Sequence, residues 1–240
     1  MHKVVLLRHG ESIWNRDNIF TGWVDVGLSK RGEEQSKEAG RLLREEGFVF
    51  DMAFTSVLSR ASQTLKLTLA EMGLQDIIQE QSWRLNERHY GALQGINKRE
   101  AVARFGEGQV KIWRRSYYVR PPAMETENGV AASVERPLTE SLEDTVKRIL
   151  PYWRDTILPA LKAGKKVLVV AHGSTLRAIV KELNQLSAQQ VEALDIPKAI
   201  PLVYELDNNL KPAKHYYLGD HQKIEQAIKA VAEEIKPLIA

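Results

Sequence analysis

The sequence has 240 residues and no cysteine. Disulfide bonds, a thiol nucleophile and cysteine-ligated metals are therefore excluded. The chain also lacks a His-Glu-x-x-His motif and any carboxylate cluster with recognisable metal-ligand spacing. We therefore expect a functional site that works without a metal.

Long apolar runs and clusters of basic residues are missing as well. No stretch approaches the ~18 apolar residues of a membrane-spanning helix, and the first run, Val4–Leu7, is too short for a signal peptide. The net charge of +3 comes from 34 basic and 31 acidic residues that are interleaved, which argues against nucleic acid as a partner. We expect a cytoplasmic protein without a membrane partner, and a small anionic substrate accounts for the slight basic excess.

Two similar units stand far apart in the chain. The apolar run Val4–Leu7 precedes Arg8-His9-Gly10, and Val167–Val170 precedes Ala171-His172-Gly173. Uninterrupted apolar runs are typical of strands buried on both faces of a parallel sheet. Ligands of open α/β sheets bind beyond the carboxyl ends of such strands. We therefore expect His9 and His172 to meet across one site.

Strands and helices alternate along the rest of the chain, which predicts a single α/β domain over residues 1–240 with a mostly parallel sheet flanked by helices. We expect strands at 51–55, 202–206 and 216–218, the last two forming a hairpin. Helices are expected at 29–46 with Ser29 as N-cap, at 59–72, at 97–105, from the capping box at Ser141 to Gly164, and at 175–183. Pro151 and Pro159 are expected to interrupt or bound the helix before Gly164.

Two segments have little pattern. Residues 121–137 have no apolar periodicity and are predicted to form a long, flexible loop. Residues 222–240 are predicted to form a C-terminal tail helix that frays rather than packs.

Several arginines indicate an anionic ligand. Arg60 falls in the first turn of its predicted helix, where a positive charge opposes the helix dipole unless an anion binds there. Arg114 and Arg115 lie side by side among aromatic residues. Such a pair usually forms a solvated face, and a cap over an anionic ligand is the rarer interpretation.

Three strings, RHGESIWN, LNERHYGALQG and AHGSTLRA, together resemble the histidine-phosphatase superfamily and, within it, the 2,3-bisphosphoglycerate-dependent phosphoglycerate mutases. The resemblance extends from Val4 to about Leu218. It implies interconversion of 3-phosphoglycerate and 2-phosphoglycerate through a phosphohistidine, with 2,3-bisphosphoglycerate as the priming phosphoryl donor. It also implies a place in glycolysis and gluconeogenesis.

The chemistry of the residues agrees with this. A neutral imidazole is a nucleophile near pH 7, so His9 can accept a phosphoryl group. Arg8 and Arg60 supply positive charge, His172 can donate to the transferred group, and Glu87 is the candidate proton carrier. His172 lies directly before a predicted helix, whose N-terminus favours an anion. This position suits His172 as a hydrogen-bond donor to the phosphoryl oxygens and leaves His9 as the nucleophile. The resemblance implies further substrate-binding residues: Ser12, Asn15, Thr21, Gly22, Tyr90, Lys98, Arg114, Arg115, Gly173 and Ser174.

The sequence departs from the mutase pattern at two places. Ser174 stands where the family usually has asparagine, and a serine hydroxyl can still bond phosphate with a shorter reach. The 121–137 loop is shorter than in many members of the family. The resemblance makes a homodimer possible, and any subunit contact that the longer loop makes in other members would differ here. Two alternatives stay open: a phosphomonoesterase in which water accepts the phosphoryl group from His9, and a non-catalytic phospholigand-binding protein that has kept the fold.

Overall fold

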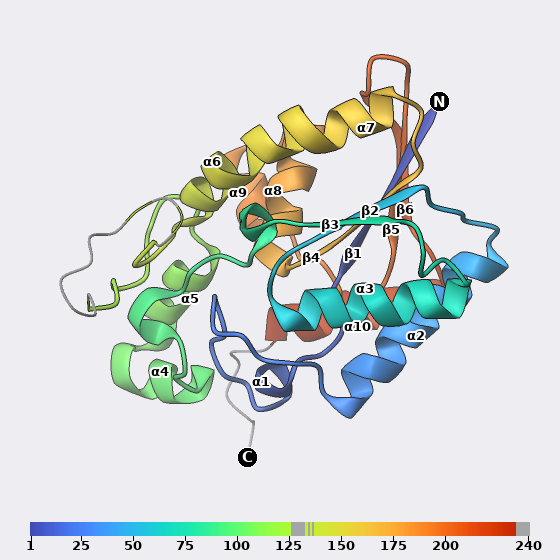
Figure 1. Ribbon diagram of the computed structural model, residues 1–240. Helices are drawn as coiled ribbons and strands as arrows, with labels where there is room; N and C mark the ends of the chain where they lie inside the picture. Colours follow the sequence, from blue (N-terminus) through green and yellow to red (C-terminus); the bar gives the residue numbers. More distant parts are fainter. Residues whose placement is uncertain (126–132, 134, 136, 234–240) are drawn as a thin grey trace.

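The computed structural model describes residues 1–125, 133, 135 and 137–233, and they form an α/β structure around one mixed sheet (Figure 1). The sheet has six strands in the order β3-β2-β4-β1-β5-β6. Its strands are β1 (His2–Arg8), β2 (Met52–Thr55), β3 (Ile78–Gln81), β4 (Val167–Ala171), β5 (Leu202–Leu206) and β6 (Pro212–Tyr217). The pairs β1·β4, β2·β4 and β2·β3 are parallel, whereas β1·β5 and β5·β6 are antiparallel. The predicted fold class is confirmed.

Helices cover both faces of this sheet. They are α1 (Ile13–Arg16), α2 (Lys30–Glu45), α3 (Ser59–Met72), α4 (Lys98–Phe105), α5 (Glu107–Arg115), α6 (Leu142–Tyr152), α7 (Leu158–Lys162), α8 (Gly173–Asn184), α9 (Ala188–Ala193) and α10 (His221–Glu233), with short 3-10 turns η1 (Trp83–Leu85) and η2 (Gly91–Leu93). Helices α2 and α3 lie on one face and α6 to α8 on the other (Figure 1). Among the described residues, no helix is both long and apolar enough to cross a membrane.

The apolar run of β1 is buried on both faces, as its composition predicts. Val4 and Leu6 pack into the core under α6 and α8, while Val5 and Leu7 pack into the core under α2 and α3. All four are at most 1% exposed. From Val4 onward, β1 therefore has no solvent-facing side chain, and the first polar side chain comes at the end of the strand, at Arg8.

The helix before β4 differs from the expected interruption at its prolines. Helix α6 continues through Pro151 into a π-helical segment, η4 (Trp153–Ile157), and then into α7, where Pro159 occupies the first turn. Proline lacks the N–H that a helix interior needs, and a wider turn accommodates the lost hydrogen bond. Trp153 and Ile157 are fully buried, so packing holds the run together.

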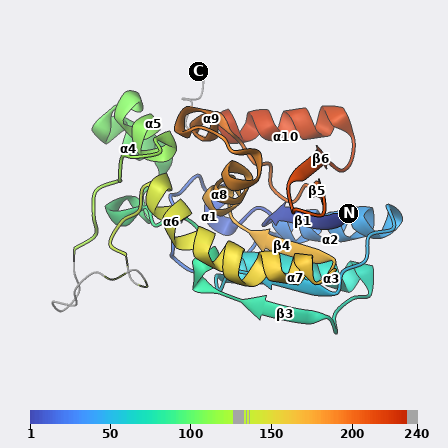
Figure 2. The ribbon, with the colours of Figure 1, turned by 90° about the horizontal axis from the view of Figure 1, so that it is seen from above.

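Two predictions about the C-terminal third are wrong in detail. Strand β6 begins at Pro212 rather than at Tyr216, and Leu218 lies beyond it. The tail does not fray within its described part: Figure 2 shows α10 running back from β6 toward the side of the molecule that carries α4 and α5. Its Ile224 and Val231 are buried, because α10 has an apolar face that packs on the body of the protein. Residues 234–240, and 126–132, 134 and 136 of the predicted 121–137 loop, lie outside the described residues.

Candidate active site

The register of β1 against β4 brings the two strand-His-Gly units together. Arg8 pairs with Ala171, and the His9 N–H donates to the Ala171 carbonyl at 2.9 Å. His9 and His172 therefore follow adjacent strand ends, and their ring centroids lie 4.9 Å apart. The predicted meeting of the two histidines is confirmed.

His9 is held in one tautomer. Its Nδ1 lies 2.7 Å from the Gly10 carbonyl oxygen, which can only accept, so Nδ1 carries the proton and Nε2 keeps the lone pair. Burial, reinforced by the charges of Arg60 and Arg8, holds the pKa of His9 well below its usual value. Gly10 must be glycine because a Cβ there would lie 2.3 Å from the Gly32 carbonyl oxygen. The unliganded protein therefore presents a neutral imidazole whose Nε2 carries the lone pair.

His172 is fully buried beside His9, and its Nε2 lies 2.7 Å from the Ser56 hydroxyl oxygen. That oxygen also accepts the Leu58 N–H at 3.2 Å, and its own proton can be donated to His172. Nδ1 of His172 would then carry the ring proton. Within the described residues, Nδ1 of His172 and Nε of Arg8 are buried and have no hydrogen-bond partner. Such atoms are rare in folded proteins, and these two belong to the residues that flank His9, Arg8 in the sequence and His172 in space.

Arg60 is fixed by the backbone of the loop that precedes α2. Its guanidinium donates to the carbonyls of Gly22 at 2.7 Å and Val24 at 3.1 Å. Burial lowers the pKa of Arg60 to about 10, so the side chain remains charged at neutral pH. Gly22 has φ +54°, a left-handed conformation that favours glycine, and a Cβ there would also lie 2.0 Å from the Gln94 side-chain oxygen.

Glu87 is oriented through one of its two oxygens. Oε1 accepts the backbone N–H groups of Arg88 at 2.8 Å and Ser174 at 3.0 Å. The start of α8, expected to favour an anion, thus holds the Glu87 carboxylate itself. A proton exchanged between Glu87 and a bound molecule would therefore pass through Oε2.

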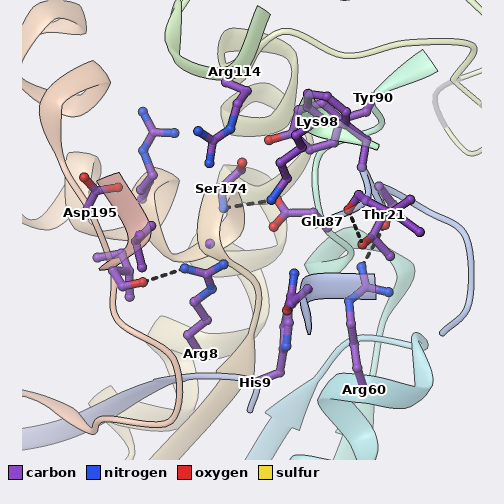
Figure 3. A pocket seen from close by; sticks show the side chains of 18 of the residues that line it. Arg8, His9, Thr21, Arg60, Glu87, Tyr90, Lys98, Arg114, Ser174 and Asp195 are labelled. Atoms are coloured by element: carbon purple, nitrogen blue, oxygen red, sulfur yellow. Dashed lines mark hydrogen bonds between the residues drawn. The ribbon is translucent and has the colours of Figure 1, made fainter. Parts of the chain in front are cut away.

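A pocket gathers most of the predicted site residues (Figure 3). Those that line it are Arg8, His9, Asn15, Thr21, Gly22, Arg60, Glu87, Tyr90, Lys98, Arg114, Arg115, Gly173 and Ser174. His172 lies against His9 but is not among the lining residues. Ser12 is not among them either: it is fully buried and caps α1, where its hydroxyl accepts the Asn15 N–H. The expected contact of Ser12 with substrate therefore has no support in this structure.

The pocket is also lined by six residues that the sequence did not predict. They are Ile19, Phe20, Arg177, Asp195, Ile196 and Val231. The sequence does contain an indication of Arg177, because this residue lies one helical turn after Gly173 and on the same face of α8. Asp195, Ile196 and Val231 come from the chain after α9 and from α10, where no sequence pattern marks them.

The end of the pocket away from His9 is strongly positive. Arg114 and Lys98 lie there (Figure 3), Arg115 and Arg177 also line the pocket, and Asp195 forms an ion pair with Arg115 at 2.7 Å. Burial and the neighbouring arginines lower the pKa of Arg177 to about 9, so it is still cationic at pH 7. Tyr90 accepts a hydrogen bond from Arg88 at 3.0 Å and keeps its own proton to donate. Among described residues, no group of three or more histidine or acidic side chains could hold a metal.

The buried histidines predict acid sensitivity of the fold. Burial lowers the pKa values of His9 and His172, whereas the unfolded chain takes up protons at these positions below about pH 6.5. Stability from these groups is complete above pH 6.5 and is lost as the pH falls toward their folded pKa values. We expect these two histidines together to lower the free energy of unfolding by up to about 3 kcal/mol between pH 6.5 and 5.0.

Urea denaturation at several pH values measures this, with His172→Gln as the control that reduces the slope. A free energy of unfolding that does not change from pH 7.5 to 5.0 would contradict the neutral, buried state of the histidines.

Comparison with known proteins agrees with this geometry. The model of the histidine phosphatase superfamily (branch 1) matches residues 4–216. A mycobacterial glucosyl-3-phosphoglycerate phosphatase, solved with VO3, is similar with a TM-score of 0.71 and 22% identity over 90% of this chain and 97% of that one. A putative alpha-ribazole-5'-P phosphatase from Escherichia coli is similar with a TM-score of 0.70 and 20% identity over 92% and 98% of the two chains. With its two histidines at adjacent strand ends and a family match over most of its length, this chain belongs to branch 1 of the histidine phosphatase superfamily.

Proposed function

We propose that this enzyme interconverts 3-phosphoglycerate and 2-phosphoglycerate through phospho-His9, with 2,3-bisphosphoglycerate as the priming donor. The observation that supports this most is the second cationic end of the pocket. Figure 3 shows Glu87 between the group of His9, Arg8 and Arg60 and the group that includes Arg114 and Lys98. A molecule with an anion at both ends matches this arrangement, because each anion meets arginine forks while its hydroxyl faces Glu87.

In the proposed reaction, Nε2 of His9 attacks the phosphorus and the bond from phosphorus to the substrate oxygen breaks. Glu87, protonated for this step, gives its proton from Oε2 to the departing oxygen. For the return transfer, Glu87 takes the proton of the attacking hydroxyl, the new oxygen–phosphorus bond forms and the bond to His9 Nε2 breaks. Arg8, Arg60 and His172 stabilise the charge on the moving phosphoryl oxygens throughout.

The second candidate is hydrolysis of a small phosphorylated metabolite, in which water takes the phosphoryl group from His9. The solved structures named above favour this candidate over the mutase, because both are phosphatases by name. Their identities of 22% and 20% support the fold and leave the acceptor to be tested.

A coupled assay separates the two candidates. Purified enzyme is given 3-phosphoglycerate with and without 2,3-bisphosphoglycerate, and formation of 2-phosphoglycerate and release of inorganic phosphate are followed in parallel. The mutase proposal predicts 2-phosphoglycerate formation that 2,3-bisphosphoglycerate stimulates and that exceeds phosphate release. Release of inorganic phosphate without formation of 2-phosphoglycerate would contradict the mutase proposal and support the phosphatase. If the protein is folded and neither product forms, the result would support a binding protein without catalytic activity.

A further inference from the structure

Glu87 lies in a segment without regular structure. Residues 86–90 follow η1 and belong to no helix or strand, so no backbone ladder fixes their position. A general acid must nevertheless be held within a fraction of an ångström of its productive geometry. The hydrogen bonds of this segment show what holds it.

One guanidinium, that of Arg148, donates to most of the backbone carbonyls of residues 83–87. Arg148, on α6, donates to the carbonyl oxygens of Trp83 at 3.3 Å, Arg84 at 2.8 Å, Asn86 at 3.2 Å and Glu87 at 3.2 Å. Apart from Glu140, its hydrogen bonds within the described chain all go to the backbone of residues 83–87, which comprise η1 and the start of the irregular segment. The Arg148 side chain is 2% exposed, so these bonds form away from water, where each is worth more.

Glu140 completes the arrangement from the other side. Its carboxylate pairs with Arg148 at 2.7 and 2.9 Å, and one of its oxygens accepts the His89 N–H at 2.9 Å. The Glu140 N–H in turn donates to the His89 carbonyl at 2.9 Å. The two partners thus hold the backbone on both sides of Glu87.

Trp23, like Arg148, contacts the Glu87 backbone. Its indole N–H donates to the Glu87 carbonyl at 2.5 Å, and the Arg148 guanidinium lies over its ring, 5.3 Å from the centroid. The Glu87 backbone is therefore fixed by groups that lie outside the pocket lining, while its carboxylate is aimed by Ser174 and Arg88.

We propose that Arg148, neutralised by Glu140, is a positioning residue that holds Glu87 for proton transfer, an inference that rests on the role proposed for Glu87. A lysine would keep the charge but could not reach four carbonyls and a carboxylate with one ammonium group. Arg148→Lys is therefore expected to shift Glu87 without removing it. The consequence is a defect confined to steps in which Glu87 moves a proton.

The test compares two phosphoryl donors in single-turnover phosphorylation of His9. p-Nitrophenolate leaves without needing a proton, whereas the alkoxide of 2,3-bisphosphoglycerate does need one. Arg148→Lys should slow phosphorylation by 2,3-bisphosphoglycerate by about 10-fold to 100-fold and by p-nitrophenyl phosphate by less than about 3-fold. A purely structural role would slow both equally. Arg154→Lys is the matched control, because Arg154 pairs with Glu182 on the surface with 56% of its side chain exposed.

Glu140→Gln is the second variant if Arg148→Lys does not fold, since the amide oxygen still accepts the His89 N–H while the charge partner is lost. Glu87→Gln serves as the reference and should show the same selective loss with 2,3-bisphosphoglycerate. If Glu87→Gln is selective but Arg148→Lys and Glu140→Gln slow both donors equally, or neither, the positioning role is wrong. If Glu87→Gln itself is not selective, the proposed role of Glu87 fails first and the inference fails with it.

Discussion

His9→Ala is expected to lower phosphoryl transfer by about 10⁴-fold or more, because the change removes the only protein atom to which the phosphoryl group bonds in the proposed mechanism. His9 Nε2 is singled out by the hydrogen bond from Nδ1 to the Gly10 carbonyl. The surrounding donors, Arg8 and Arg60, cannot replace a nucleophile. Turnover of 3-phosphoglycerate in the coupled assay measures the loss.

His172→Ala is the matched comparison, since it removes the neighbouring imidazole 4.9 Å away. That variant should be slow but measurable, because it loses a donor to the transition state and keeps the nucleophile. Activity in His9→Ala at or above the level of His172→Ala would reverse the assignment of the two histidines.

Glu87→Gln is expected to depress turnover by about 10²-fold or more with little change in KM. Glutamine keeps the side-chain oxygen that accepts the Ser174 N–H, so the shape of the pocket should survive. The amide cannot donate and retake a proton at the Oε2 position, so each transfer to or from an alkyl oxygen loses its acid–base partner. Steady-state kinetics with 3-phosphoglycerate gives both constants.

Glu87→Asp is the companion variant, because it retains a carboxylic acid but shortens the reach by one methylene. It should recover part of the activity that Glu87→Gln loses. Unchanged turnover in Glu87→Gln would remove Glu87 from the mechanism.

The sequence predicts the core of the site because local patterns determine it. An apolar run buried on both faces must end where the polar residues begin, so Arg8 and His9, like His172, had to stand at the carboxyl edge of the sheet. Arg60 was found because a cation in the first turn of a helix is unfavourable without a partner, and the structure supplies the carbonyls of Gly22 and Val24 as acceptors.

Other features depend on packing between distant segments and leave no local pattern. Asp195 reaches the pocket because the chain after α9 passes beside Arg115, and Val231 reaches it because α10 folds back from β6. Ser12 lies in a motif of polar residues, and its sequence context does not distinguish a ligand contact from the helix cap that its hydroxyl makes at α1. The partnership of Arg148 with the Glu87 backbone likewise joins residues 61 positions apart.

The central claim is that the phosphoryl group is carried by His9, and labelling tests it most directly. The enzyme is incubated with 2,3-bisphosphoglycerate labelled in its phosphoryl groups, quenched in alkali, digested and mapped by peptide. Phosphohistidine is stable in alkali and labile in acid, so the label should be acid-labile and lie on the peptide that contains His9. His172→Ala should still acquire label slowly, and His9→Ala should acquire none. Label on the His172 peptide, or label that persists in His9→Ala, would contradict the account.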